Sequence, residues 1–417
     1  MAGLREDFLW GASTSPHQIE GNNVNADWWA MENAPGSPFP DRSGDAVDSY
    51  HRYAEDMKLL ADAGLNAYRF GFEWARIEPA DGQFSRAERD HYRRMVDTAH
   101  ELGLAPVVTL QHFTLPRWFA ESGGWRRPDA ADRFARYIEF VSTALRDVEW
   151  VCTINEPNML AVFASIQDVL LNATGSRQAG TADGGQEGGQ ADGQAATELA
   201  TALAGVRPDQ ALGDTLAQVH RRAVEVVRGT TNAKAGWTVA QQSFTPTPGN
   251  EEVFGRVHHG WEGFYLDVAR EDDFVGVQAY TSQPVDANGP VPHPEHPENT
   301  LTGWAYRPDA LGTSLRRAWE EAGGVPLLVT ENGIATDDDT RRIAYTTEAL
   351  GHLEAAVADG LDVRGYLHWS ALDNYEWGRY APTFGLIAVD RETFVRTPKP
   401  SLAWLGARAR AHRNGPQ

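Results

Sequence analysis

The sequence predicts an α/β fold, a single closed (β/α)8 TIM barrel with long loops after its strands. Eight short apolar stretches alternate with helical stretches along the chain, which is the order of elements in such a barrel. Two of the apolar stretches end on a glutamate beside an asparagine, and active sites of these barrels lie at the C-terminal ends of the strands. At 417 residues the chain has the length of two average domains or of one barrel enlarged by loops, and the alternation favours the barrel.

The expected strands are rich in β-branched and other apolar residues, as strands buried on both faces are. They are residues 8–13, 66–71, 105–110, 149–154, 233–238, 274–278, 327–330 and 363–369. Helices are expected between them at residues 48–63, 86–102, 130–145, 209–227, 251–266, 309–322 and 341–359. Gly64, Gly103 and Gly360 each follow a helical stretch, and glycine commonly ends helices.

One segment interrupts this alternation. Residues 172–206 are rich in Gly, Ala, Gln and Asp, a composition that supplies almost no apolar side chains to a core. Because strand and helix alternate again after it, we interpret this segment as a loop insertion in one domain that spans residues 1–417. Residues 180–194 are expected to be the most mobile part of the chain.

The composition limits the possible partners. The formal net charge of −21 argues against nucleic acid and against an anionic membrane surface, because both attract positive patches. The sequence has no run of roughly 18 apolar residues and no apolar signal segment near its start. Cys152 is the only cysteine, which excludes an intramolecular disulfide, and its apolar strand predicts an inert core thiol. We therefore expect a cytoplasmic protein; the sequence does not indicate its oligomeric state.

The two strands that end on glutamate predict a paired-carboxylate site. In the stretch 151–157 the proline cannot donate to a sheet ladder, so the strand ends there and leaves Asn155 and Glu156 at its tip. A carboxylate at the end of an apolar strand is poorly solvated, which raises its pKa and suits it to carrying a proton. That stretch alone is equally consistent with a simple helix start. The stretch 325–333, which ends on Glu331 beside an asparagine, favours the paired site.

Four motifs, in this order along the chain, resemble glycoside hydrolase family 1, the retaining β-glucosidases and β-galactosidases. They are Phe8-Leu9-Trp10-Gly11-Ala12-Ser13-Thr14 with Gln18-Ile19-Glu20-Gly21, Thr153-Ile154-Asn155-Glu156-Pro157, Val329-Thr330-Glu331-Asn332-Gly333, and the stretch from His368 to Trp377. A lone Asn-Glu-Pro is a weak signal, whereas four long motifs in register are specific. The resemblance covers nearly the whole chain except about residues 158–207.

The resemblance implies roles for five residues. Glu156 is expected to be the general acid/base and Glu331 the nucleophile, with their carboxyl groups about 5–5.5 Å apart. Asn155 is expected to bind the sugar 2-hydroxyl. Arg69 and Tyr280 resemble the pair that holds the nucleophile, although a structural ion pair and ordinary packing are the alternatives for them. A cation beside Glu331 should lower its pKa and keep it ionised while Glu156 stays protonated.

The resemblance also implies a sugar-binding set, in which Trp369 forms a stacking floor. The set is Gln18, His112, Asn155, Trp369, Glu376, Trp377 and Phe384. Glu376 can accept hydrogen bonds from two hydroxyls, which suits the 4- and 6-positions of a hexose and opposes a 6-phosphate. A glutamate rather than a glutamine at position 156 argues against the thioglucosidase branch.

Three positions depart from the family pattern. Phe113 stands where tryptophan is frequent, so one indole N–H contact to the sugar is expected to be lost. Gln278 and Ala279 precede Tyr280 where Asn-Tyr is common, which leaves the local hydrogen bonding open. Asn158 and the insertion replace the usual segment after the acid/base, so the leaving group cannot be inferred from the family.

No metal or other cofactor is expected, and the predicted partner is a small-molecule β-glycoside. His258-His259 and His293-Pro294-Glu295-His296 are interpreted as solvated loop histidines, and the stretch 337–339 as a solvated turn, because they lack metal-ligand spacing. The predicted activity is that of a retaining β-glucosidase. A β-galactosidase, a β-fucosidase and a transglycosylase are the alternatives in the same class. A non-catalytic sugar-binding protein is a further alternative, which the presence of both Glu156 and Glu331 opposes.

Overall fold

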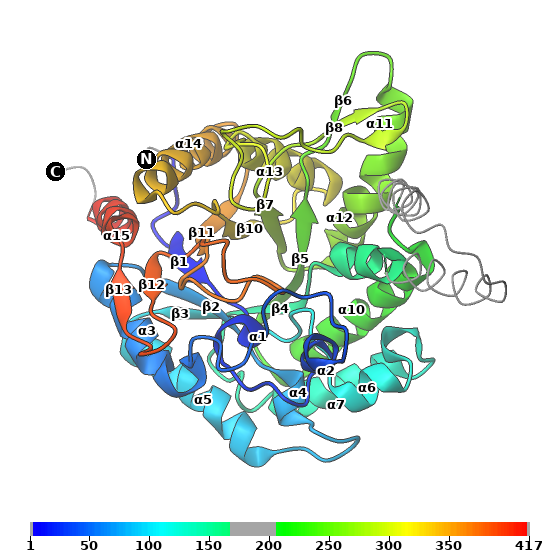
Figure 1. Cartoon of the computed structure of the whole chain (residues 1–417), viewed down its shortest axis with the longest axis vertical. Helices are drawn as coiled ribbons and strands as arrows, with labels where there is room; N and C mark the ends of the chain where they lie inside the picture. The colour runs from blue at the N-terminus through cyan, green and yellow to red at the C-terminus, as the bar shows by residue number, and fades with distance from the viewer. Residues whose placement is uncertain (1–2, 167–205, 415–417) are drawn as a thin grey trace, which may run out of the picture.

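Eight parallel strands close into a barrel at the centre of the molecule (Figure 1). The computed structural model describes residues 3–166 and 206–414. The strands are β1 (Leu9–Ser13), β2 (Ala67–Gly71), β3 (Ala105–Thr109), β4 (Trp150–Asn155), β5 (Lys234–Gln241), β7 (Val275–Ala279), β10 (Leu327–Asn332) and β11 (Val363–Trp369). Their order is β1-β11-β10-β7-β5-β4-β3-β2, so β11 closes onto β1. The predicted TIM barrel is confirmed, and each predicted strand overlaps an observed one.

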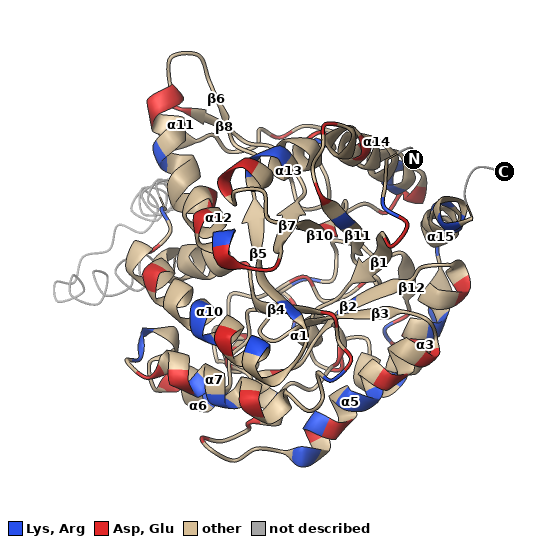
Figure 2. Ribbon diagram, turned by 180° about the vertical axis from the view of Figure 1, so that it is seen from behind, with Lys and Arg blue, Asp and Glu red and all other residues tan. Residues whose placement is uncertain are grey.

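Helices cover the outside of this barrel. They are α3 (Ser49–Ala63), α5 (Arg86–Glu101), α7 (Ala130–Val141), α10 (Gln210–Thr230), α11 (Glu251–His258), α12 (Phe264–Val268), α13 (Ala310–Glu321), α14 (Asp339–Ala358) and α15 (Pro400–Arg413). Figure 2 shows that charged residues gather on these helices, whereas the strands are mostly uncharged. The helix predicted at 251–266 is divided by a π-helical turn, His259–Gly263. Over the described ranges, no helix has the length and apolar character needed to cross a membrane.

Short elements lie in the loops. They are α1 (Pro16–Ile19), α2 (Asp27–Asn33), α4 (Trp74–Ile77), α6 (Arg117–Glu121), the 3-10 turns Gly124–Arg126 and Ala269–Glu271, and the strands β6 (Thr245–Pro246), β8 (Pro284–Asp286), β9 (Gly289–Pro290), β12 (Ile387–Val389) and β13 (Arg396–Pro398). A helix also begins at Pro157, directly after β4. Residues 180–194, for which high mobility is predicted, lie outside the described residues.

Two hydrophobic cores follow from the alternation of side chains along the strands. One fills the space between the strands and the surrounding helices. A smaller one includes Cys152 and consists of Leu9, Ala67, Val107, Trp150, Cys152, Phe274, Leu328 and Leu367. Cys152 is fully buried, and burial raises the pKa of its thiol, as expected for a core cysteine.

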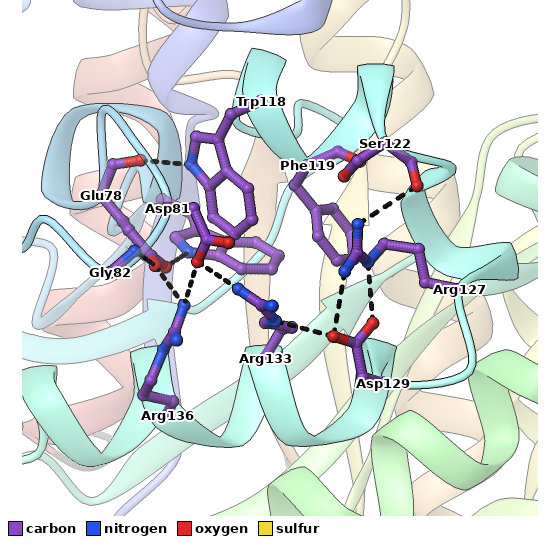
Figure 3. A network of polar contacts seen from close by, with 11 residues as sticks. Glu78, Asp81, Gly82, Trp118, Phe119, Ser122, Arg127, Asp129, Arg133 and Arg136 are labelled. Atoms are coloured by element: carbon purple, nitrogen blue, oxygen red, sulfur yellow. Dashed lines mark hydrogen bonds and ion pairs between the residues drawn. The ribbon is translucent and has the colours of Figure 1, made fainter.

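A network of ion pairs ties α7 to the loop after α4 (Figure 3). Arg136 donates to Glu78 over 2.5 Å and to Asp81 over 3.0 Å, and Arg133 also pairs with Asp81. The Trp118 indole N–H donates to the backbone carbonyl of Glu78 over 2.8 Å. These contacts lie outside the barrel and stabilise the loop that follows β2.

The interpretation of His258 as a solvated loop residue is wrong. It lies on α11, is 8% exposed, and its Nε2 is 2.5 Å from a carboxylate oxygen of Glu321. The π-helical turn brings Glu262 to within 3.3 Å of its other ring nitrogen. Burial alone would lower the pKa of His258, but the two carboxylates outweigh burial and raise it to about 9.

The interpretation of residues 337–339 as a solvated turn is also wrong in part. Asp338 caps α14, because its carboxylate accepts the Thr340 N–H at 2.9 Å. Asp339 accepts the Ser401 N–H at 2.7 Å and thereby joins the start of α14 to the start of α15. The stretch is therefore a helix start with a tertiary contact.

A buried ion pair anchors the hairpin β12–β13, which follows the loop carrying Glu376. The Arg396 Nε donates to Asp56 on α3 over 2.7 Å, and neither side chain is more than 1% exposed. Ser49 donates to the other oxygen of Asp56 over 2.7 Å. A buried guanidinium needs such a partner, because an unpaired charge in the interior is costly.

We predict that Asp56→Ala lowers the free energy of unfolding by roughly 3–5 kcal/mol, because it leaves the Arg396 guanidinium buried without its partner. Asp62→Ala is the matched control on the same helix. It removes an exposed ion pair with Lys58, whose side chain is 62% exposed, and should cost less than about 1 kcal/mol. Urea denaturation followed by circular dichroism measures both. Equal losses in the two variants would contradict the prediction.

Candidate active site

Glu331 lies near the end of β10 with both carboxylate oxygens held by donors. The Arg69 Nη1 donates to Oε1 over 2.5 Å, and the Tyr280 hydroxyl donates to Oε2 over 2.5 Å. Arg69 is fully buried on β2, so its charge meets Glu331 with little screening by water. The structure thus brings together the three residues that the resemblance groups around the predicted nucleophile.

The amide of Asn155 at the end of β4 is oriented by an unusually complete set of partners. Its Oδ1 accepts from the Arg69 Nη2 at 2.6 Å, the Thr238 hydroxyl at 3.0 Å and the Gln278 amide at 3.0 Å. Its Nδ2 lies 3.2 Å from the His112 Nε2. Because burial, followed by the charge of Arg69, lowers the pKa of His112 well below its ordinary value, the imidazole is neutral and can accept this hydrogen bond.

Glu156 has a strained backbone. Its φ is 45°, in the left-handed region that favours glycine, and its N–H donates to the Thr238 carbonyl over 2.9 Å. The strand ends before Pro157, as predicted, and a helix begins at this proline, so the helix start considered as the alternative is present as well. Strained residues of this kind cluster at functional sites, where the surrounding structure stabilises them.

The two glutamates have different electrostatic environments. Burial, and then the negative charge of Glu331, raise the pKa of Glu156 well above that of an ordinary carboxyl. Burial also raises the pKa of Glu331, but the charge of Arg69 and the hydrogen bonds from Tyr280 and Arg69 oppose that rise. As expected, the charge of Arg69 lowers the pKa of Glu331, but burial outweighs the cation and the net shift is upward. Because Arg69 and Tyr280 both donate to Glu331, its ionised form is favoured, which in turn favours the protonated form of Glu156, as expected.

Glu376 lies in the loop after β11, between two donors. Its Oε2 accepts from the Gln18 amide at 3.2 Å, and its Oε1 accepts from the Trp369 indole at 3.2 Å. Burial raises the pKa of Glu376 to about 8. The Oε1 of Gln18 is buried without a hydrogen-bond partner among the described residues, so it remains an acceptor for a ligand. Trp369 and Trp377 both stack against His112, with ring centroids 5.9 and 6.2 Å away.

A cavity of about 590 Å³ opens at these side chains. Most of the predicted site residues border it, together with apolar residues nearer its mouth. Its lining includes His112, Phe113, Glu156, Met159, Phe163, Gln241, Gln242, Gln278, Tyr280, Leu301, Trp304, Glu331, Trp369, Glu376, Trp377 and Phe384. Gln18, Asn155 and Arg69 lie behind this lining, in contact with Glu376, His112 and Glu331 respectively.

Several of the lining residues were not identified from the sequence. Phe163 and Trp304 lie in regions where the sequence shows no family motif, so no local signal marks them. Thr238 lies behind the lining and could have been found, because it is on a predicted strand and donates to Asn155. Phe113, with a φ of 66°, packs against Phe163 and Trp377 and presents no N–H to the cavity, as its replacement of tryptophan predicts. In the described part of the chain, no group of three His, Cys, Asp or Glu side chains is arranged to hold a metal ion.

The profile of glycosyl hydrolase family 1 matches residues 1–171 and 228–414, leaving out the inserted segment and most of α10. The chain belongs to this family. It is 32% identical to thermostable β-glucosidase B of Thermobispora bispora over 98% of this chain and 91% of the relative. It is 31% identical to a bifunctional β-D-glucosidase/β-D-fucosidase of Bifidobacterium breve over 95% of this chain and 96% of the relative.

Solved structures agree with this assignment. The crystal structure of β-glycosidase BGL167 superposes with a TM-score of 0.84 at 41% identity, over 100% of this chain and 98% of that one. The β-glucosidase from Thermotoga maritima in complex with glucoimidazole superposes with a TM-score of 0.82 at 28% identity, over 99% of this chain and 100% of that one. The chain is therefore a glycoside hydrolase, a retaining β-glycosidase, as its motifs predicted.

We predict that Tyr280→Phe moves the acidic limb of the pH–kcat/KM profile upward by about one pH unit. The hydrogen bond from Tyr280 lowers the pKa of Glu331, so its loss raises that pKa. The expected nucleophile has to be ionised, so activity should be lost at the low-pH side first. Tyr306→Phe, which removes a phenol bonded to Glu348, is the control and should leave the limb in place. An acidic limb that stays unchanged or moves downward in Tyr280→Phe would contradict this arrangement.

Proposed function

We propose that the enzyme hydrolyses β-D-glucosides with Glu331 as the nucleophile and Glu156 as the general acid/base. The observation that carries this assignment is the unequal set of partners on the two carboxyl groups. Glu331 has a donor on each oxygen, which favours the ionised form. Glu156 is buried beside that negative charge, which favours the protonated form.

In the first step, the Glu331 carboxylate attacks the anomeric carbon and the bond from that carbon to the leaving oxygen breaks. Glu156 gives its proton to the leaving oxygen, so the aglycone departs as a neutral alcohol and a glycosyl-enzyme remains. The pKa of Tyr280 is raised far above its ordinary value, first by burial, so its hydroxyl stays protonated and can donate throughout. One N–H of the Asn155 amide donates to His112, and the other can bind the sugar 2-hydroxyl.

In the second step, Glu156 is a carboxylate and takes one proton from a water molecule. The water oxygen bonds to the anomeric carbon while the ester bond to Glu331 breaks, which releases glucose and restores both side chains. Two inversions at the same carbon retain the β configuration. Each step needs the opposite protonation state of Glu156, which is why a pKa near the working pH suits this residue.

The sugar specificity is proposed to depend on Glu376 and Gln18. Glu376 can accept from hydroxyls at the 4- and 6-positions of a hexose, and Gln18 has a free acceptor beside it. The relative from Bifidobacterium breve is named a β-D-glucosidase and β-D-fucosidase, and fucose lacks the 6-hydroxyl. We therefore propose β-D-glucosides as the preferred substrates and β-D-fucosides as the second class. The single buried cysteine supports a reducing, cytoplasmic setting as part of this proposal.

We predict that Glu331→Ala and Glu156→Ala differ in their dependence on the leaving group. Glu331→Ala should lose about 10⁴-fold or more in hydrolysis of every substrate, because no nucleophile remains. With dinitrophenyl β-D-glucoside, Glu156→Ala should keep the first step, because the dinitrophenolate departs without a proton. The glycosyl-enzyme should then accumulate. Added azide, which needs no base, should restore turnover in Glu156→Ala and give the β-glucosyl azide. An α-azide from Glu156→Ala, or a β-azide from Glu331→Ala, would reverse the two assignments.

We predict that Glu376→Ala lowers kcat/KM for p-nitrophenyl β-D-glucoside by roughly 10- to 100-fold, because it removes hydrogen bonds between a carboxyl group and the sugar hydroxyls. The loss for p-nitrophenyl β-D-fucoside should be smaller, since that sugar has no 6-hydroxyl to lose. Glu392→Ala, at an exposed position in the β12–β13 hairpin, is the control. Equal losses on the two sugars would show that Glu376 does not bind the 6-position.

A further inference from the structure

Gln278 is a buried glutamine at the active site with one half of its amide unused. Its side chain is 1% exposed and borders the cavity that holds the two glutamates. The Nε2 donates to Asn155, but the Oε1 has no hydrogen-bond partner among the described residues. A buried amide oxygen without a donor is unfavourable, and such atoms call for an explanation. A ligand that donates a hydrogen bond to Oε1 during the reaction would explain why this oxygen has no partner in the protein.

The position of Gln278 limits what that ligand can be. In the barrel, Gln278 on β7 pairs in register with Glu331 on β10 and with Ala240 on β5. Its amide reaches Asn155 on β4, the residue directly before Glu156. The side chain therefore extends from the strand beside the proposed nucleophile to the residue beside the proposed acid/base. The hydrolytic water must lie between the same two glutamates.

Water and an alcohol differ in the hydrogen-bond acceptors that they need in this region. When either attacks the anomeric carbon, its oxygen bonds to that carbon, the ester bond to Glu331 breaks and one proton passes to Glu156. The oxygen of an alcohol then carries no further hydrogen. Water keeps a second hydrogen, which becomes the anomeric hydroxyl of glucose, and that hydrogen needs an acceptor while the new bond forms.

We propose that the Oε1 of Gln278 accepts this second hydrogen and thereby favours water over alcohols as the molecule that releases the sugar. The inference rests on the proposed double displacement, because it concerns the second step alone. It makes Gln278 a residue that sets the ratio of hydrolysis to transglycosylation. Its Nε2 serves Asn155 at the same time, and Asn155 retains the donors Arg69 and Thr238 if that contact is lost.

The test uses p-nitrophenyl β-D-glucoside with methanol as the competing acceptor. Release of p-nitrophenol counts every glycosyl-enzyme formed, and release of glucose counts those that water resolves. The ratio of methyl glucoside to glucose therefore reports the second step and does not depend on the rate of the first. Gln278→Met, of similar shape, should raise that ratio about two- to tenfold at a given methanol concentration, the range expected for one lost hydrogen bond.

Thr238→Val is the matched control. It removes the same kind of hydrogen bond to the Asn155 oxygen, together with a longer one of 3.3 Å from the Glu156 backbone N–H. It takes no acceptor from the cavity, so the ratio should stay at the wild-type value. If Gln278→Met does not fold, Gln278→Leu removes the same oxygen and is measured instead. The proposal would be overturned if a Gln278 variant that releases p-nitrophenol keeps the wild-type ratio of methyl glucoside to glucose. It would also be overturned if Thr238→Val raises that ratio equally. Failure of the wild-type enzyme to release p-nitrophenol would instead count against the proposed function.

Discussion

The buried guanidinium of Arg69 is the constraint on which the rest of the site depends. Its three nitrogens donate to Thr109 on β3, Asn155 on β4 and Glu331 on β10, over 2.9, 2.6 and 2.5 Å. A cation that is not exposed to water needs an anionic or polar partner for each of its donors, because an unpaired buried charge is strongly destabilising. The barrel meets that demand with its proposed catalytic groups, so the same contacts hold the fold closed and orient the site.

The arrangement separates two carboxyl groups of the same type into two chemical roles. Burial raises the pKa values of both Glu156 and Glu331, and the cation is close only to the second. The negative charge therefore stays on Glu331 and in turn disfavours ionisation of Glu156. A retaining mechanism needs this asymmetry, with one ionised nucleophile and one protonated acid. The protonated state of Glu156 thus depends in part on the charge of Glu331.

Two of the proposed sugar-binding residues lie in a loop rather than on a strand. Glu376 and Trp377 lie in a loop that is held at one end by the barrel and at the other by the hairpin β12–β13. That hairpin is anchored to α3 through the pair Arg396 and Asp56. Rigid support of this kind matters, because sugar hydroxyls are recognised by hydrogen bonds whose strength falls steeply with misalignment. A contact on the outside of the barrel thus supports the proposed sugar-binding loop that follows β11.

The sequence by itself determined the strands, most of the helices and the places of Glu156 and Glu331, because these follow from local periodicity and from proline ending a strand. The closed barrel then brings all C-terminal strand ends to one face, which made the pairing of the two glutamates predictable. Only the tertiary structure decided that Thr238 and Gln278 hold Asn155, and that His258 lies between two carboxylates. Those contacts depend on the register between strands and on the division of one helix by a π-helical turn. Neither feature is encoded in a pattern of neighbouring residues.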